Sequence, residues 1–170
     1  GPDGSIWVGI GPRGEGEQSI DVFDPSSPTE FKPFYADQDD PYKFSGGYVN
    51  QIYFGLDGTP WIATTRGLNR LNLGDDTFNR YSHDASNPET MSSNSAVEVI
   101  ERESEPGILW VGTTGGLNRL DISTGTFSRF TTEDGLPNNT IYGLLEDGQG
   151  RLWMSTNKGI SRFTPETSEF

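Results

Sequence analysis

The feature that most constrains this sequence is a repeat organised around its four tryptophans. Each tryptophan follows a glycine-bearing turn, and in three copies a leucine or isoleucine lies seven positions after it and a phenylalanine 17 positions after it. These three pairs are Trp61 and Phe78, Trp110 and Phe127, and Trp153 and Phe170. Trp7 begins a first copy that is longer than the others, in which Ile20 stands in place of the leucine or isoleucine and Phe31 in place of the phenylalanine. A spacing repeated in this way predicts a fold that uses one structural unit several times.

Short alternating segments between these landmarks predict strands rather than helices. The regular part supplies Tyr48–Phe54, Trp61–Thr65, Leu68–Asn72 and Phe78–Tyr81, and the series restarts at Ala96–Ile100 and at Thr140–Leu145. Ser5–Gly9, Ser19–Phe23 and Phe31–Tyr35 precede it. Pro33 places the last of these at a sheet edge, because proline cannot donate to a ladder. The 22 glycines and 11 prolines suit many strands joined by turns.

Four antiparallel strands per unit of about 43 to 54 residues are typical of a β-propeller. The expected fold is therefore all-β, a propeller of four-stranded antiparallel blades with about four blades, some of them incomplete. The blade copies are expected near 3–35, 47–81, 95–130 and 140–170, with innermost strands near Tyr48–Phe54, Ser95–Glu101 and Thr140–Glu146. The first copy has no inner strand, and closed propellers typically need four to eight blades. Residues 1–170 are thus interpreted as a propeller segment, completed by the remaining blades of a parent protein or by another copy of the chain.

Two parts of the repeat have structural explanations. A tryptophan ring is large enough to join adjacent blades, and its N–H needs a partner when it is buried. The Gly-Leu-Asn-Arg segments at 67–70 and 116–119 combine a glycine that tolerates positive φ with a leucine that packs. The following Asn69-Arg70 and Asn118-Arg119 are expected to lie towards the outer edge of each blade.

These residues carry a resemblance to a known family. Leu109-Trp-Val-Gly-Thr-Thr-Gly-Gly-Leu-Asn-Arg-Leu-Asp121, followed by Gly135-Leu-Pro-Asn-Asn139, resembles the two-component regulator propeller repeat. Gly150–Phe163 is similar to another copy, and Asn87–Asn94 resembles the loop between copies. The resemblance covers nearly everything from Gly47 onward. The first copy departs from it, since it carries a long loop and lacks the Gly-Leu-Asn-Arg core.

The resemblance implies a sensor. Proteins with this repeat resemble the extracytoplasmic regions of hybrid two-component systems, in which propellers stand outside the membrane, a histidine kinase lies inside, and many members are associated with polysaccharide sensing. A bacterial, periplasmic or extracellular location is therefore expected, with a role in signal transduction. The implied function is non-catalytic sensing of an oligosaccharide or another polar ligand, without a cofactor. Any kinase activity would lie outside this chain, because His83, the only histidine, sits in a polar loop rather than on an amphipathic helix.

Two other function classes stay open. One is a cell-surface propeller that serves protein interaction or structure. The other, less favoured, is a fragment of a propeller-fold enzyme that degrades polysaccharides, which would need paired carboxylates or a base. The acids that stand out, Asp57, Asp75, Asp76 and Asp147, occupy turns, where aspartate is common for its own reasons. Neither G-x-S-x-G nor H-E-x-x-H occurs, so no catalytic residue is assigned.

Composition argues against several partners. A net charge of −13 disfavours nucleic acid and anionic membranes, and no apolar run approaches the roughly 20 residues of a membrane span. Absence of cysteine excludes disulfides and thiolate metal sites. Gly9–Gly14 matches G-x-G-x-x-G, but its prolines and glycines oppose the helix that a dinucleotide site requires. The acidic loop Ala36–Gly47 lacks EF-hand spacing and is interpreted as solvated, so no metal is assigned.

The loops that vary between copies predict where a ligand would bind. In a propeller of this strand order, loops entering the inner strands share a face with the turns between second and third strands. The variable segments are Gly11–Gln18, Ala36–Gly46, Ser82–Asn94 and Thr131–Asn139, with Thr65-Arg66, Thr114-Gly115 and Asn157-Lys158 in the short turns. A constant scaffold with one variable face is typical of a binding site. The candidate ligand-binding residues are Arg66, Lys158, Asn157, Asn139, Asn94 and Tyr48. Taken singly, each is better explained by solvation of a turn, and it is as a set that they are the candidates.

Overall fold

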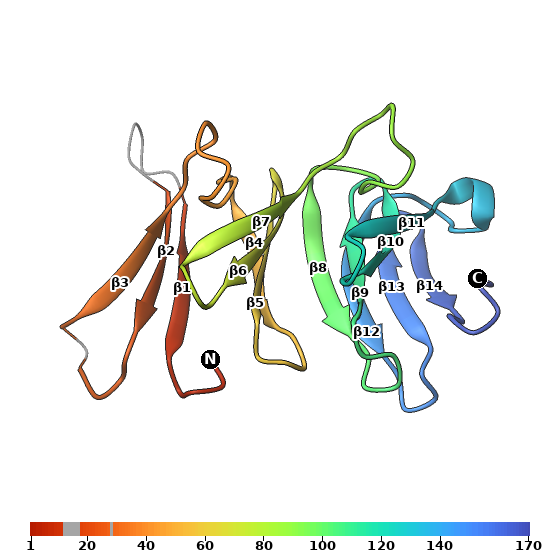
Figure 1. Ribbon diagram of the computed structural model, residues 1–170. Helices are drawn as coiled ribbons and strands as arrows, with labels where there is room; N and C mark the ends of the chain where they lie inside the picture. Colours follow the sequence, from red (N-terminus) through yellow and green to blue (C-terminus); the bar gives the residue numbers. More distant parts are fainter. Residues whose placement is uncertain (12–17, 28) are drawn as a thin grey trace.

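The computed structural model describes residues 1–11, 18–27 and 29–170 as four antiparallel sheets set side by side (Figure 1). The first sheet contains β1 (Ile6–Ile10), β2 (Ser19–Phe23) and β3 (Phe31–Tyr35), and the second β4 (Val49–Phe54), β5 (Pro60–Thr64), β6 (Gly67–Asn72) and β7 (Thr77–Tyr81). The third contains β8 (Ala96–Glu101), β9 (Ile108–Thr113), β10 (Gly116–Asp121) and β11 (Thr126–Phe130), and the fourth β12 (Ile141–Glu146), β13 (Leu152–Thr156) and β14 (Gly159–Phe163). A single 3₁₀ turn, η1 (Thr132–Asp134), precedes β12 in this described part of the chain. The predicted all-β propeller of four antiparallel blades is confirmed.

The inner strands β4, β8 and β12 join neighbouring blades. β8 contacts both β4 and β12, and all three strands carry an irregularity of register near their start. The Gln51 side chain on β4 accepts a hydrogen bond of 2.6 Å from the backbone N–H of Val99 on β8. The Glu98 carboxylate on β8 accepts one of 2.7 Å from the N–H of Leu144 on β12. Amides at the blade junctions are therefore satisfied by side chains from the preceding blade.

The first and fourth sheets each contain three strands. β1 carries Trp7 and occupies the place that β5, β9 and β13 take in their sheets, so the described first sheet has no inner strand. After β14, the pair Thr164 and Glu169 forms only a bridge where a fourth strand would begin. β3 lies at a sheet edge and contains Pro33, as the sequence predicted.

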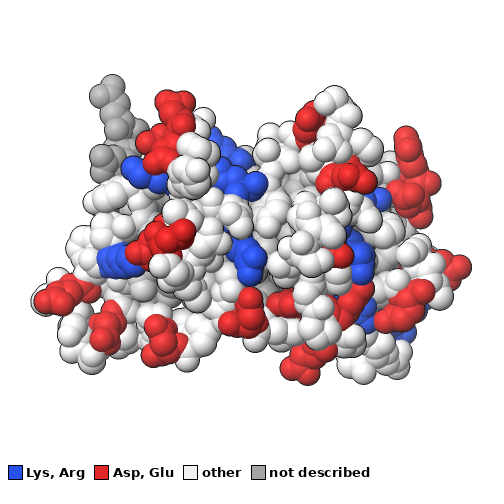
Figure 2. Space-filling model, in the orientation of Figure 1, with Lys and Arg blue, Asp and Glu red and all other residues white. Residues whose placement is uncertain are grey.

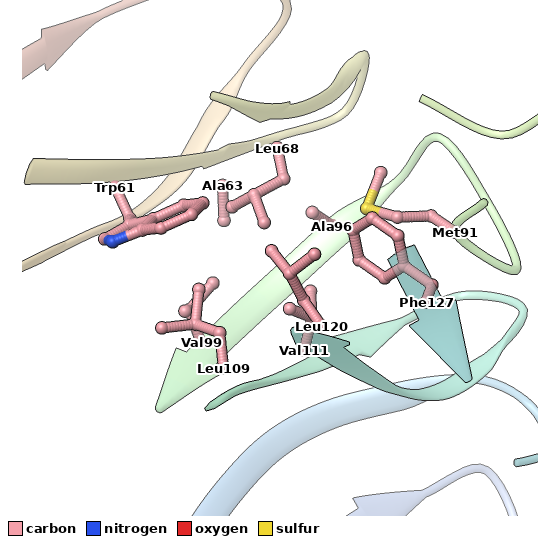
Figure 3. Close-up of a cluster of buried hydrophobic side chains, with 10 residues drawn as sticks. All are labelled: Trp61, Ala63, Leu68, Met91, Ala96, Val99, Leu109, Val111, Leu120 and Phe127. Carbon is pink, nitrogen blue, oxygen red and sulfur yellow. The ribbon is translucent and has the colours of Figure 1, made fainter. Parts of the chain in front are cut away.

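Hydrophobic cores form at the junctions between blades. Figure 3 shows the cluster at the junction between the second and third blades, where Trp61 from the second blade faces Val99 and Leu109 from the third. Trp110 of the third blade similarly packs into a cluster with Phe163 of the fourth. Both rings are only 1% exposed. Burial of a side chain of this size contributes roughly 2–3 kcal/mol, so the predicted joining role holds for these two tryptophans.

Trp153 departs from this pattern. Its ring is 38% exposed and lies on a face that also exposes Leu145 and Ile160. In the two preceding copies the equivalent ring is covered by the next blade, and no blade follows the fourth among the described residues. At the opposite end, the first sheet exposes Ile6 and Phe31. The structure therefore ends on two apolar sheet faces.

The Gly-Leu-Asn-Arg segments begin the third strand of their blades, next to the outermost strand. Gly67 and Gly116 have φ of 132° and 139°, and a Cβ on Gly116 would lie 2.5 Å from the carbonyl oxygen of Phe130. Asn69 and Asn118 are completely buried. A buried amide needs hydrogen-bond partners, and these two find them in the loop that leads into the same blade and in the neighbouring second strand.

Candidate functional site

The loops that enter the inner strands and the short turns between second and third strands lie on one face, the upper face in Figure 1. Tyr48, at the entry to β4, forms two hydrogen bonds with Thr65 in the β5–β6 turn. Its carbonyl accepts one from the Thr65 amide at 3.0 Å, and its amide donates one to the Thr65 hydroxyl at 3.1 Å. In the next blade the hydroxyls of Ser93 and Thr114 lie 2.9 Å apart. This shared face is the one the sequence predicted. The segment 11–18 and the G-x-G-x-x-G pattern fall mostly on residues 12–17, outside the described residues.

The short turns on this face have the same construction in three blades. The hydroxyl of Thr64, Thr113 or Thr156 donates to the carbonyl of the glycine three residues later, at 2.9–3.0 Å. The same oxygen accepts a hydrogen bond from the amide two residues later, at 3.0–3.1 Å. The residue that donates this amide is Arg66 in the second blade, Gly115 in the third and Lys158 in the fourth. The same turn therefore presents a guanidinium in one blade, no side chain in the next and an ammonium in the last.

A polar pocket of about 390 Å³ opens at the junction between the second and third blades. Its lining residues are Gln38, Ser45, Thr65, Arg66, Arg80, Tyr81, Ser82 and Asn94. They come from the loop entering β4, the β5–β6 turn, the end of β7 and the loop entering β8. Two predicted site residues, Arg66 and Asn94, meet in this pocket, which we call the upper pocket. None of its lining residues carries a carboxylate.

The upper pocket holds positive charge that no acidic group neutralises. Within residues 1–11, 18–27 and 29–170, the exposed Arg66 guanidinium has neither an ion pair nor a hydrogen bond. The Arg80 guanidinium donates to backbone carbonyls of the loop entering β4, including those of Gln38 at 3.1 Å and Lys43. Carbonyls are neutral, so the charge of Arg80 persists. Figure 2 shows a group of basic side chains below the upper loops near β7, on a surface where acidic groups prevail.

Tyr81 forms part of the wall of the upper pocket. Its ring stacks on Trp61 with centroids 5.8 Å apart and meets Phe127 edge-on. Burial raises the pKa of the Tyr81 phenol, so this hydroxyl stays protonated at ordinary pH and adds no negative charge to the pocket.

The other predicted residues are spread over the same face. The Asn139 side chain accepts a hydrogen bond of 2.8 Å from the Thr132 amide, just as Asn94 accepts one of 2.7 Å from the His83 amide. Both asparagines thus close the loop that precedes their inner strand. Asn157 accepts a hydrogen bond from the Tyr142 hydroxyl, Lys158 is exposed on the fourth blade, and Tyr48 is exposed outside the upper pocket. The structure therefore brings Arg66 and Asn94 together in the upper pocket, and the other four do not line it.

Sequence reasoning missed the part played by Arg80. This residue lies on β7, the expected outer strand, but its side chain turns back and holds the loop entering β4. Arg129 on β11 does the same for the loop entering β8, with bonds of 2.6 and 2.7 Å to the carbonyls of Thr90 and Asn87. The signal was an arginine at the same strand position in two copies, each preceded along the chain by a long loop. Gln38, Ser45 and Ser82 carried no comparable pattern.

A larger pocket of about 730 Å³ lies on the opposite, lower face. Arg102, whose side chain is 3% exposed, crosses from the third blade to bond Glu146 at 2.9 Å and Glu166 at 2.7 Å. A Cβ on Gly150 would lie 2.8 Å from this guanidinium. Because these charged groups satisfy one another, we interpret the lower pocket as a structural junction between blades. The upper pocket, whose two guanidiniums have no acidic partner among the described residues, is the better candidate for a ligand.

The acids in turns have structural partners. Asp57, Asp75 and Asp147 accept backbone hydrogen bonds from residues two positions later, at 2.8, 3.1 and 2.9 Å. The turn interpretation of these acids is confirmed. His83 contacts the Met91 carbonyl through Nδ1 at 2.7 Å. In the part of the chain that the structure describes, no three His, Cys, Asp or Glu side chains gather as a metal site.

Comparison with known families supports the resemblance. Residues 135–158 match the model of the two component regulator propeller family, which confirms the predicted resemblance in this repeat. A search of curated proteins finds no significant match. The described residues contain no helix that is long and apolar enough to cross a membrane.

Solved structures share the fold. The extracellular domain of BT3049 from B. thetaiotaomicron, assigned as a hybrid two component system, is 22% identical with a TM-score of 0.77, over 96% of this chain and 24% of that protein. PorZ, a surface component of the type-IX secretion system of Porphyromonas gingivalis, is 19% identical with a TM-score of 0.71, over 95% and 24%. A virginiamycin B lyase from Staphylococcus aureus is 16% identical with a TM-score of 0.60, over 98% and 55%. The chain spans about a quarter of the length of the first two proteins.

Proposed function

We propose that this chain is a non-catalytic ligand-sensing segment of an extracytoplasmic two-component sensor, located in the periplasm or outside the cell. The upper pocket, which combines free cationic and polar groups at a blade junction, is the observation that carries the proposal. Its volume of about 390 Å³ lies within the range usual for small-ligand sites. Its lining, rich in hydroxyls and amides, suits an oligosaccharide or another polyhydroxylated ligand. The match of residues 135–158 to the regulator propeller family supports the sensor role.

Calorimetric titration of the complete propeller with a panel of oligosaccharides tests this function. Arg66→Ala should weaken binding about tenfold or more, because hydrogen bonds to a charged group contribute roughly 1.5–3 kcal/mol. Lys158→Ala, measured separately, shows whether the ligand extends to the fourth blade.

The matched control is Arg119→Ala. Arg119 is a partly exposed arginine on β10 that does not line the upper pocket, whereas Arg80 and Arg129 each hold a loop and would be poor controls. Binding that is weakened only by the Arg119 variant would show that the ligand site lies elsewhere.

Different observations bear on the two alternative functions. A surface protein-interaction module is favoured by the similarity to PorZ, which is described as a surface component of a secretion system. Such a module would bind a protein partner and none of the oligosaccharides. A polysaccharide-degrading enzyme fragment is less favoured, because the three turn acids described above are engaged in hydrogen bonds to their own backbone. Product formation from a polysaccharide would establish the enzyme instead.

We also propose that further blades of a parent propeller cover the two apolar end faces. The equivalent surfaces inside the chain offer the precedent, since Trp61 and Trp110 are each buried by the blade that follows. A blade of the same repeat would cover Trp153, Leu145 and Ile160 in the same way.

A further inference from the structure

The chain contains two equivalent junctions that can be compared position by position. At the second junction, between the second and third blades, the β5–β6 turn presents Arg66. At the third junction, between the third and fourth blades, the β9–β10 turn presents Gly115. The loops beside these turns are also equivalent, because the amides of Ser45 and Ser92 both donate to a buried asparagine side chain at 2.8 Å.

The turn of the third blade is closed by its own loop. A Cβ on Gly115 would lie 2.6 Å from the carbonyl oxygen of Ser92, so no side chain could stand there. The Ser92 hydroxyl is satisfied, with the Thr113 hydroxyl and the Asn118 amide each 2.9 Å away. The hydroxyls of Ser92 and Ser93 beside this turn are therefore engaged within their own blade.

The turn of the second blade is open. Its loop ends in Gly46-Gly47 where the third blade has Ser93-Asn94, and both glycines have positive φ, 75° and 85°. A Cβ on Gly47 would lie 3.0 Å from Cγ of Arg66. The missing side chain thus makes room for the arginine stem. The Ser45 hydroxyl, which lines the pocket, is buried and has no hydrogen-bond partner among the described residues.

Cations outside the upper pocket offer a comparison. Several other cations have an acidic partner, for example Lys32 with Asp76 at 2.6 Å, and Arg119 with Glu105 at 2.7 Å. In a chain of net charge −13, a cation can readily find a carboxylate. The upper pocket instead holds two guanidiniums, Arg66 and Arg80, without an acid in its lining.

We propose that the upper pocket binds an anionic group, the carboxylate or sulfate of a charged saccharide, through the Arg66 guanidinium. This inference rests on the proposed function and specifies the chemistry of its ligand. The planar guanidinium donates two parallel hydrogen bonds to such a group, and Arg80 adds a second positive charge that is fixed by its loop carbonyls. The hydroxyls and amides of the lining bind the rest of the sugar.

Protection of arginine from a dicarbonyl reagent tests this proposal residue by residue. The complete propeller is treated with phenylglyoxal in sodium sulfate, in sodium glucuronate, in sodium chloride and in sodium chloride with added glucose, all at equal ionic strength. Peptide mass spectrometry then reports the rate of modification at Arg66 and, as an internal control, at the partly exposed Arg119. Sulfate and glucuronate should slow modification of Arg66 severalfold relative to chloride, while added glucose leaves the rate unchanged and Arg119 reacts equally throughout.

Three results would overturn the proposal: unchanged modification of Arg66 in both anions, equal protection by glucose, or equal protection of Arg119. Protection by sulfate alone or by glucuronate alone would identify which anion the pocket accepts. Arg66→Lys should lose most of the affinity for a charged oligosaccharide, because an ammonium cannot form the paired hydrogen bonds. If neutral oligosaccharides bind the propeller and no anion protects Arg66, the sensing function stands and the anion inference fails.

Discussion

At the scale of single residues, aspartate side chains stabilise several turns through hydrogen bonds. Asp24, Asp84 and Asp121 each accept hydrogen bonds from both the amide and the hydroxyl of a serine two positions later. These bonds stabilise the ionised carboxylate and lower its pKa. The many acids that give the chain its negative charge therefore include a set with a structural role.

Asp147 gives a testable pH dependence. Hydrogen bonds from the side chains of Arg151 and Trp153 hold the pKa of its carboxyl well below the ordinary value of 3.8. Because the folded-state pKa is depressed, the stabilisation is complete above the unfolded-state pKa and is lost as the pH falls from about 4 towards the folded-state pKa. Asp147→Asn should thus lower the thermal midpoint at pH 7, and the gap to the parent protein should narrow steadily below pH 4. Thermal unfolding of both proteins from pH 7 to pH 2 measures this difference in midpoint. A difference that does not change with pH would contradict the prediction.

At the scale of strands and turns, the third strand of each regular blade is set by a glycine that must adopt positive φ. Gly116 begins β10 with φ of 139° directly opposite the Phe130 carbonyl. An added methyl group there meets both backbone strain and a backbone atom that cannot move aside. The same constraint holds at Gly67, which begins β6 with its Cβ position 2.6 Å from the Tyr81 carbonyl.

Gly116→Ala should destabilise the fold by about 1–3 kcal/mol, the usual cost of a strained backbone position. The matched control is Gly74→Ala in the β6–β7 turn, where φ is not positive and no atom lies within 4 Å of the new methyl group. Urea unfolding of the two variants measures the difference. Equal midpoints for both would show that the strand start relaxes around the substitution.

At the scale of the whole molecule, the two end faces decide how the 170-residue chain behaves in isolation. Apolar sheet faces of this kind are normally covered, and open arrays expose edges that pair with other chains. Trp153 and Ile160 are exposed on the fourth blade, and Ile6 and Phe31 on the first.

Light scattering on the isolated chain should therefore detect self-association rather than a stable, well-folded monomer. Ile160→Lys should reduce this association, because a charge on the end face opposes contact with another apolar surface. Leu73→Lys, a change at an exposed leucine in the β6–β7 turn, should have little effect. A stable monomer of the unsubstituted chain would contradict the proposal that further blades cover these faces.

The sequence by itself determined the fold. The repeat spacing and the strand alternation predicted four antiparallel blades, because both are local patterns that recur along the chain. Pro33 predicted an edge strand by a local rule of its own, since proline cannot donate to a ladder. It also predicted the shared face of loops and turns, since strand order alone places them there.

Only the tertiary structure decided which residues meet. Arg66 and Asn94 line one pocket because neighbouring blades bring the β5–β6 turn beside the loop entering β8, a contact that no local pattern encodes. Asn69 and Asn118 are completely buried because a loop from their own blade folds over them. Trp153 occupies the same repeat position as Trp110 but is exposed, because the burial of this tryptophan depends on the blade that packs against it.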